Sequence, residues 1–538
     1  MEAFDYVIVG AGSAGAVLAN RLTECGRFRV ALLEAGGHDR DLWIQMPIGY
    51  GKVFHDEKVN WKYTTEPIAG LKDRRSYWPR GKVLGGSSSI NAMVYVRGHP
   101  SDYAEWNAAA PGWAWDDVEP IFRRMEDWDG PSSPARGKGG PLPVHDVTDE
   151  VHPLTRIFLE AARQTGIPTN PDYNGENMEG AACYQITTKG GFRASTARSY
   201  LKPAKRRQNL EIRTGAHVTR VLFEGLRATG VKFQQNGQTK TLQARAEVIL
   251  SAGAINSPQL LQLSGVGPGE VLQDHGIPVR LNASHVGRNL QDHLGSDNYY
   301  TSNVPSLNQA LGPLWGKTKA ALQYALMRTG PLSLSLNQGG GFISMSDASQ
   351  GPDLQLYFSP VSYTRAPEGI RPLMRPDPFK GFLMGFNPCK PTSVGHLNIC
   401  SPDPMASPEI HPNYLDTEED RALMVAGTRL MREIAQAPAL RSVIESELLP
   451  GAQATSDADI SRYIQENAWT VFHACSTCRM GRDPATSVVD PQLKVHGLKG
   501  LRIADASIFP TIPTGNTNAP AIMVGEKASD IILQSATS

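Results

Sequence analysis

The chain has 538 residues, a length that suits two to four domains. Lys and Arg number 53 and Asp and Glu number 53, so the formal net charge is zero. This balance excludes an overall electrostatic attraction to nucleic acid or anionic lipid as the main activity. Hydrophobic residues make up 40% of the chain, which indicates a folded globular protein rather than a disordered one.

Cysteine content and the first residues suggest the compartment. Six cysteines are too few for a disulfide framework in a chain of this length, and they suit a reducing cytoplasm. We expect no signal peptide, because an apolar strand-like run begins already at Phe4. No apolar stretch approaches the length of a membrane span. These features predict a cytoplasmic protein without a transmembrane segment.

The amino-terminal residues have the pattern of one βαβ unit. Residues 6–9 and 29–34 are apolar runs typical of buried strands, and residues 16–22 favour a helix. The turn between the first strand and the helix reads Gly10-Ala11-Gly12-Ser13-Ala14-Gly15. This order of elements is the context in which a GxGxxG motif indicates dinucleotide binding.

Each glycine of that motif has a physical task. Gly10 permits the tight turn, Gly12 lets backbone N–H groups approach a pyrophosphate, and Gly15 lets the helix pack closely on the strand. Glu34 follows Gly15 by 19 residues, the distance expected for a carboxylate that accepts hydrogen bonds from ribose hydroxyls. The motif does not choose between NAD and FAD, although its place at the start of a long chain favours FAD.

Two further segments are rich in small residues. In residues 80–98, a Gly-Gly-Ser-Ser-Ser turn offers backbone N–H groups to a flat polar ring or a phosphate, although an ordinary loop explains it equally well. In residues 253–267, Ser257 is expected to cap a helix whose first residue is Pro258.

Both segments resemble the two signatures of the glucose–methanol–choline (GMC) flavoprotein oxidoreductases. Residues 286–293, 472–481 and 500–510 are also similar to that family. The resemblance extends from Phe4 to about Leu533 and is greatest to the choline-dehydrogenase-like branch. It implies an FAD-dependent alcohol dehydrogenase or oxidase acting on CH–OH donors. The partners would be a small-molecule alcohol and an electron acceptor, namely O₂, a quinone or another carrier, and no nucleic acid.

The resemblance also implies an α/β fold with two discontinuous domains. A Rossmann-like FAD-binding domain would take residues 1–150, 208–294 and 470–538. A substrate-binding domain of the α+β type, an antiparallel sheet backed by helices, would take 151–207 and 295–469. Apolar patterns predict strands at 210–213, 219–223 and 352–358 and a helix over 423–434. We expect residues 301–320 to form part of a lid over the site.

The family pattern assigns roles to individual residues. His473 would act as catalytic base, since a neutral imidazole can accept the hydroxyl proton, and Asn516 would hold the developing alkoxide. Val218 would lie beside the adenine. The remaining residues expected to bind the cofactor are Ser13, Ala14, Ala35, Gly81, Val83, Gly86, Ser87, Asn91, Ala92, Met93, Val94, Asp505, Ala506 and Thr517.

Two positions bear on the subtype. Family members with covalent FAD carry a His just before the motif's Asn, where this chain has Ile90, so we expect non-covalent FAD. Choline-acting members carry a Glu where this chain has Gln338, which favours an uncharged primary alcohol oxidised to its aldehyde. Phe342 and Phe472 are expected to add apolar substrate contacts.

Several alternatives stay open. They are a choline-type dehydrogenase or oxidase, a GMC-fold lyase that keeps FAD structurally, and a flavoprotein used only as a binding module. Cys475 and Cys478 suggest a redox or zinc motif, but no second pair of ligands lies nearby in the sequence, so we expect a small-residue turn and no metal.

Overall fold

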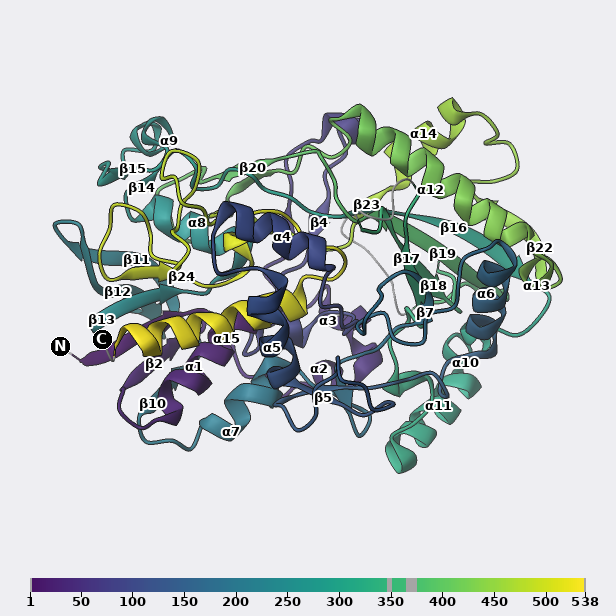
Figure 1. Cartoon of the computed structure of the whole chain (residues 1–538), viewed down its shortest axis with the longest axis horizontal. Helices are drawn as coiled ribbons and strands as arrows, with labels where there is room; N and C mark the ends of the chain where they lie inside the picture. Colours follow the sequence, from purple (N-terminus) through teal and green to yellow (C-terminus); the bar gives the residue numbers. More distant parts are fainter. Residues whose placement is uncertain (1, 346–350, 364–374, 537–538) are drawn as a thin grey trace.

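The computed structural model describes residues 2–345, 351–363 and 375–536, and its strands form two large sheets (Figure 1). The first sheet lies in the part of the molecule that holds both chain ends, and the second lies at the opposite end. The expected α/β fold, with an additional antiparallel sheet backed by helices, is confirmed. The exact domain boundaries stay a prediction.

The first sheet contains the βαβ unit. Its order is β10-β2-β1-β13-β12-β11, and β24 also pairs with β13. The strands β10, β2, β1, β13 and β24 pair in parallel, whereas β11 and β12 continue antiparallel from β13. Their bounds are β1 (Ala3–Val9), β2 (Val30–Leu33), β10 (Leu210–Arg213), β11 (His217–Glu224), β12 (Arg227–Gln235), β13 (Gln238–Leu250) and β24 (Leu501–Ile503).

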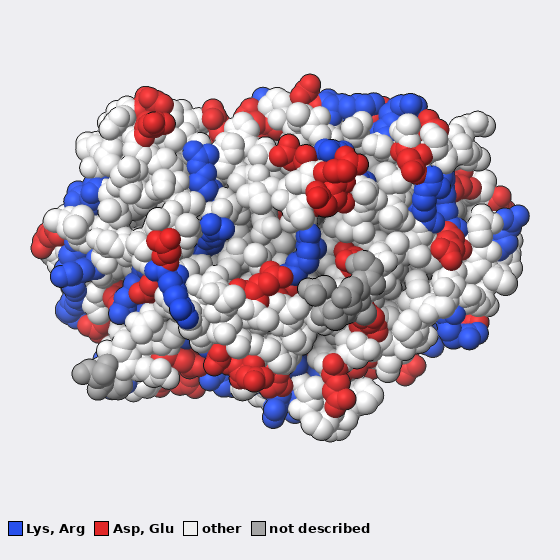
Figure 2. Space-filling view, turned by 45° about the horizontal axis from the view of Figure 1, so that its top comes forward, with Lys and Arg blue, Asp and Glu red and all other residues white. Residues whose placement is uncertain are grey.

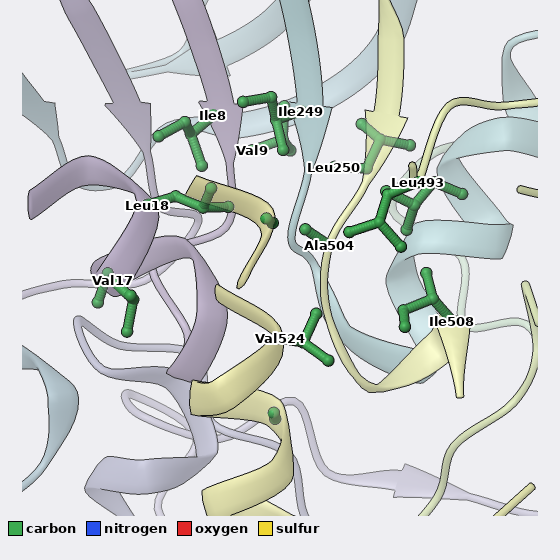
Figure 3. Packing of buried hydrophobic residues seen from close by; sticks show 14 of the residues in the cluster. Ile8, Val9, Val17, Leu18, Ile249, Leu250, Leu493, Ala504, Ile508 and Val524 are labelled. Atoms are coloured by element: carbon green, nitrogen blue, oxygen red, sulfur yellow. The ribbon is translucent and has the colours of Figure 1, made fainter. Parts of the chain in front are cut away.

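Two helices cover one face of this sheet. Helix α1 (Ser13–Glu24) and helix α15 (Asn518–Ser535) lie side by side, although the sequence separates them by almost the whole chain (Figure 1). Figure 3 shows Val17 of α1 and Val524 of α15 near the apolar ends of β1 and β13. Gly525 permits this close packing, because a Cβ there would lie 2.8 Å from the Ala14 carbonyl oxygen.

The second sheet is antiparallel throughout. Its order is β22-β16-β19-β18-β17-β7, and β23 also pairs with β16. Helices α6 (Pro153–Gln164) and α12 (Glu418–Gln436) pack on it through their apolar sides. The strand bounds are β7 (Gly180–Cys183), β16 (Leu294–Ser302), β17 (Gly339–Ile343), β18 (Leu354–Ser359), β19 (Gly381–Pro388), β22 (Ile444–Leu449) and β23 (Trp469–Thr470).

Smaller elements connect and cover the sheets. The helices are α2 (Leu42–Gln45), α3 (Tyr50–Val53), α4 (Pro100–Ala109), α5 (Trp115–Met125), α7 (Lys202–Ala204), α8 (Gly253–Leu263), α9 (Gly269–Asp274), α10 (Leu307–Leu311), α11 (Leu314–Met327), α13 (Pro438–Arg441) and α14 (Asp457–Asn467). The paired short strands are β3 (Tyr63–Thr64) with β4 (Tyr77–Trp78), β5 (Glu126–Trp128) with β6 (Leu142–Val144), β8 (Thr188–Lys189) with β9 (Phe192–Arg193), β14 (Val266–Gly267) with β15 (Leu281–Asn282), and β20 (His396–Asn398) with β21 (Glu409–His411).

The predicted strands at 210–213, 219–223 and 352–358 and the helix over 423–434 are confirmed. The predicted start of helix α8 is wrong, because the helix begins at Gly253 and Pro258 lies inside it. A proline there cannot donate to the carbonyl of Ala254. The Thr477 hydroxyl donates to that carbonyl instead, at 2.6 Å, so the helix tolerates Pro258.

Charged residues of both signs are interspersed over the face shown in Figure 2, as the zero net charge suggests. Within the ranges described, none of the helices combines the length and the apolarity that crossing a membrane requires.

Candidate functional site

A single cavity adjoins the βαβ turn, the antiparallel sheet and the loops that precede α15. It lies at the carboxyl ends of the parallel strands, where doubly wound sheets bind ligands. The predicted residues that line it are Gly10, Gly12, Ser13, Ala14, Glu34, Ala35, Gly81, Gly86, Ser87, Asn91, Ala92, Met93, Val94, Val218, Phe472, His473, Asp505, Ala506, Asn516 and Thr517.

The turn after β1 has the geometry that its glycines require. Gly10 has a φ of +96°, and a Cβ there would lie 2.4 Å from the carbonyl oxygen of Ser251. Gly12 is the residue that precedes α1, and Ser13 and Ala14 line the cavity. The first N–H groups of a helix have no partner within it. The turn therefore offers backbone donors, and the positive end of the helix dipole, to an anionic group in the cavity.

Glu34 lies at the end of β2, beside this turn. Its carboxylate accepts hydrogen bonds from the backbone N–H groups of Ala11 and Gly36, each at 2.9 Å. Burial raises the pKa of Glu34 to about 7. Glu34 lines the cavity, and its carboxylate has lone pairs to spare for further hydrogen bonds from ligand hydroxyls.

Gly15 and Val83 do not line the cavity and instead pack behind it. A Cβ at Gly15 would lie 2.0 Å from the carbonyl oxygen of Gly10, so Gly15 holds helix α1 against the turn. The Val83 side chain is fully buried. Direct cofactor contact by Val83 is therefore a prediction that the cavity geometry does not support.

His473 and Asn516 meet in the cavity although 43 residues separate them. The distance between Asn516 Nδ2 and His473 Nε2 is 3.0 Å. The side chain of Gln355, from β18, donates to Asn516 Oδ1 at 3.0 Å and so orients the amide with its NH₂ group toward the imidazole. The loops that carry His473 and Asn516 therefore place an amide N–H donor next to an imidazole nitrogen in the cavity.

His293 fixes the tautomer of His473. Its Nε2 lies 2.9 Å from the carbonyl oxygen of Cys389, which can only accept, so this nitrogen carries the proton of the neutral ring. His293 Nδ1 then accepts from His473 Nδ1, also at 2.9 Å. His473 Nε2 consequently carries a lone pair, and this atom, next to Asn516, is the one able to take a proton.

Asp292 positions the backbone of the same loop. Its buried carboxylate accepts from the His473 N–H at 2.5 Å and from the hydroxyls of Thr470 and Tyr414. These bonds hold the chain through Phe472, whose φ of +70° is uncommon for a bulky residue. Segment 286–293 therefore contributes two residues to the site, Asp292 and His293, that the sequence analysis did not assign.

His473 is neutral near pH 7. Burial, together with the neighbouring His293 ring and the Arg80 guanidinium, holds the pKa of His473 well below that of a free imidazole. Burial also lowers the pKa of His293 to about 4. Both rings therefore have the neutral form that the hydrogen-bond pattern requires, and His473 is in the form that can act as a base.

Two predicted substrate residues lie elsewhere, and these assignments need correction. Gln338 is buried outside the cavity lining, where its side-chain oxygen accepts from the His152 N–H at 2.7 Å and from the Thr155 hydroxyl at 3.3 Å. Its neighbour Asn337 lines the cavity instead. The ring of Phe342 is fully buried behind Gly515. Neither Gln338 nor Phe342 contacts the space where a substrate would lie.

Aromatic residues that the sequence analysis missed form one side of the cavity. Tyr50, Phe54, Phe472 and Trp469 follow one another with ring-centre distances of 5.3–5.7 Å, and we call these four residues the aromatic wall. They come from segments more than 400 residues apart, so no local pattern could have revealed them. Only Phe472 was predicted.

Three polar side chains of the second sheet and its flanks also line the cavity. They are Asp297, Tyr357 and Tyr363. Asp297 accepts a hydrogen bond from Trp469 Nε1 at 3.1 Å. The buried hydroxyl of Tyr357 has no hydrogen-bond partner among the described residues, so a ligand in the cavity could supply one.

Two other expectations concern neighbouring segments. None of the described residues from 301 to 320 lines the cavity, but α10, which occupies this segment with the start of α11, belongs to the same apolar cluster as Tyr50 and Leu336, which do line it. The lid stays a prediction. Cys475 and Cys478 are buried and free, and burial raises the pKa of both thiols.

The chain is similar to known proteins over nearly its whole length. Residues 4–295 and 391–525 match the amino- and carboxyl-terminal models of the family described as GMC oxidoreductase. The chain is 42% identical over 540 residues to an oxygen-dependent choline dehydrogenase of Photobacterium profundum, covering 98% of this chain and 93% of that protein. It is also 42% identical to an alcohol dehydrogenase [acceptor] of Pseudomonas putida, covering 99% and 96% of the two chains. The crystal structure of pyridoxine 4-oxidase from Mesorbium loti superposes with a TM-score of 0.89 at 32% identity, covering 98% and 99%.

Proposed function

Because the chain belongs to the GMC oxidoreductase family and is an FAD-dependent oxidoreductase, we propose that it oxidises an uncharged primary alcohol to the aldehyde. The observation that carries this proposal is the neutral His473, whose Nε2 lone pair lies beside the Asn516 amide in the cavity that the βαβ turn also lines. A base and a hydrogen-bond donor at one point are what alcohol oxidation needs.

The cavity fits FAD. The N–H groups at the start of α1 suit the pyrophosphate, and the Glu34 carboxylate suits the ribose hydroxyls. Asp505 also lines the cavity, and its carboxylate accepts hydrogen bonds from the Gly253 N–H and the Ser257 hydroxyl. Bound FAD would supply the hydride acceptor.

His473 and Asn516 would divide the remaining work. His473 Nε2 would take the hydroxyl proton of the alcohol, while His293 keeps the other ring nitrogen protonated and the ring in place. Asn516 Nδ2 would donate to the alcohol oxygen as negative charge develops on it, since Gln355 already holds the amide in that orientation. Asp292 would keep the loop of His473 from moving.

The aromatic wall favours an alkyl or aryl alcohol. Its rings, with Leu336 nearby, offer apolar contact area to the part of the substrate that carries no hydroxyl. A cationic alcohol of the choline type is the second candidate, because the carboxylate of Asp297 lines the same cavity and aromatic faces attract cations.

A substrate panel tests the proposal. We expect the purified protein, assayed with an artificial dye and with O₂ in parallel, to show a higher kcat/KM for at least one neutral primary alcohol than for choline. A choline kcat/KM above every neutral alcohol would support the second candidate instead. Anaerobic mixing that leaves the flavin oxidised with every alcohol would contradict alcohol oxidation and favour a lyase or a binding protein.

We expect FAD to be held without a covalent bond. Ile90 lines the cavity at the position where a His could link to the flavin, and its side chain carries no nucleophile. Among the described residues that line the cavity there is no cysteine. Acid precipitation should therefore release the flavin absorbance into the supernatant. Flavin that stays with the precipitated chain would show that a covalent link exists.

A further inference from the structure

Helix α11 exposes five large apolar side chains, four of them on one side. Trp315 is 82% exposed, Leu326 is 75% exposed and Leu322 is 59% exposed, and Leu314 and Met327 are exposed as well. The other large apolar side chains that are exposed lie scattered over the described surface, singly or in adjacent pairs. Scattered exposure is ordinary, whereas a group of five on one 14-residue helix indicates an interaction surface.

The spacing gathers four of these residues into a continuous stripe, and Met327 falls outside it. At about 100° per residue, Leu314, Trp315, Leu322 and Leu326 fall within about 120° of the helix circumference. The opposite side of α11 is buried through Ala320 and Tyr324. Along the stripe, the Thr318 hydroxyl donates to the Leu314 carbonyl at 2.9 Å, so even this polar group has a partner inside the helix.

The charge around this stripe has one sign. Lys317 and Lys319 lie on opposite sides of the stripe, and Arg328 follows the helix. No Asp or Glu occurs between residues 298 and 346, so these three cations stand without acids in their stretch of sequence. Within the described part of the chain, none of the three forms a salt bridge. The zero net charge of the whole chain therefore conceals a local cationic region.

We propose that α11 docks this protein on the surface of an anionic lipid bilayer. The opposite side of α11 packs on the protein, so the exposed Trp and Leu side chains can enter the boundary between lipid headgroups and acyl chains while the flanking lysines stay at the headgroups. The lysine stems can extend along the apolar stripe while their ammonium groups reach lipid phosphates. A 14-residue helix is about 21 Å long, shorter than the roughly 30 Å hydrocarbon core, so α11 would lie in the membrane plane.

A second copy of the chain suits this surface less well. A twofold interface brings the same patch of both copies together. The cations Lys317, Lys319 and Arg328 of both copies would then enter one interface, and the segment has no acid to pair with them. An anionic lipid surface supplies the opposite charge that a second copy lacks.

Docking through α11 would bring the cavity close to the bilayer. Tyr324, on the buried side of α11, belongs to the same apolar cluster as Tyr50, Leu336 and Tyr363, which line the cavity. If the proposed alcohol oxidation holds, a lipid-soluble alcohol or electron acceptor could then reach the cavity from the membrane. The docking itself does not depend on that activity.

Vesicle flotation of the FAD-loaded full chain tests this proposal. We expect binding to vesicles of phosphatidylcholine with phosphatidylglycerol and much weaker binding to phosphatidylcholine alone. The triple variant W315S/L322S/L326S should bind anionic vesicles at least tenfold less. The matched control L42S/L226S/M405S, which removes three exposed apolar side chains elsewhere, should bind like the wild type. The double variant K317E/K319E should lose binding without any change in the apolar stripe.

Three outcomes would overturn the proposal. One is equal vesicle binding by the wild type, the apolar triple variant and the lysine variant. Another is no vesicle binding by the wild type. The last is a dimer that W315S/L322S/L326S turns into a monomer, without vesicle binding by either, which would make this face an interface between copies. Dye-linked alcohol oxidation without lipid, measured on every variant, reports folding and separates failure of docking from failure of the proposed activity.

Discussion

Replacing His473 by alanine is expected to slow flavin reduction by alcohol by about 10²- to 10⁴-fold, the usual contribution of a general base. His473 Nε2 is the unprotonated ring nitrogen in the cavity, and burial keeps the ring neutral. The variant should still bind FAD, because the turn at Gly10 and the Glu34 carboxylate are untouched. Anaerobic rapid mixing with saturating alcohol, monitored at the flavin band, measures the rate.

The matched control for this experiment is His396→Ala. His396 also has a lowered pKa, but it is half-buried, stacks on the His411 ring and does not line the cavity. In the His396→Ala variant, alcohol should reduce the flavin at the wild-type rate. Flavin reduction in His473→Ala within threefold of that control would show that another group takes the proton.

Replacing Gly15 by alanine is expected to weaken FAD binding by about 5- to 150-fold. The added Cβ would lie 2.0 Å from the Gly10 carbonyl oxygen, so helix α1 must move away from the turn that faces the pyrophosphate. Such overpacking costs about 1–3 kcal/mol, and about 1.4 kcal/mol corresponds to a tenfold change in affinity. Titration of the apoprotein with FAD measures the dissociation constant.

Gly37→Ala is the control in the same βαβ region. A Cβ at Gly37 would meet no atom within 4 Å, and its φ lies outside the left-handed region, so FAD should bind this variant as it binds the wild type. Thermal unfolding of each apoprotein shows whether Gly15→Ala still folds. Equal dissociation constants for the two variants would contradict the role of Gly15 in placing α1.

Sequence alone was enough where chemistry depends on residues close together in the chain. The strand, the glycine turn, the helix and the acid at position 34 form one local unit, and the structure places Gly10, Gly12 and Glu34 along the cavity as expected. Backbone conformation and short-range spacing fix such a unit, so few residues are needed to predict it.

Only the tertiary structure decided which distant residues meet. His293 reaches His473 across 180 residues, and Asp292 holds the same loop. No periodicity or spacing predicts such contacts, because they depend on how β16, β23 and the connecting loops pack together.

The tertiary structure also decided which side of a segment faces the cavity. Neighbouring side chains of an extended chain point in opposite directions, so Asn337 lines the cavity while Gln338 bonds to His152. The leucines of α11 are equally apolar in the sequence whether buried or exposed, and the packing of Ala320 and Tyr324 determined which side stayed in solvent. Residue type is local information, but burial depends on what the rest of the chain places against each residue.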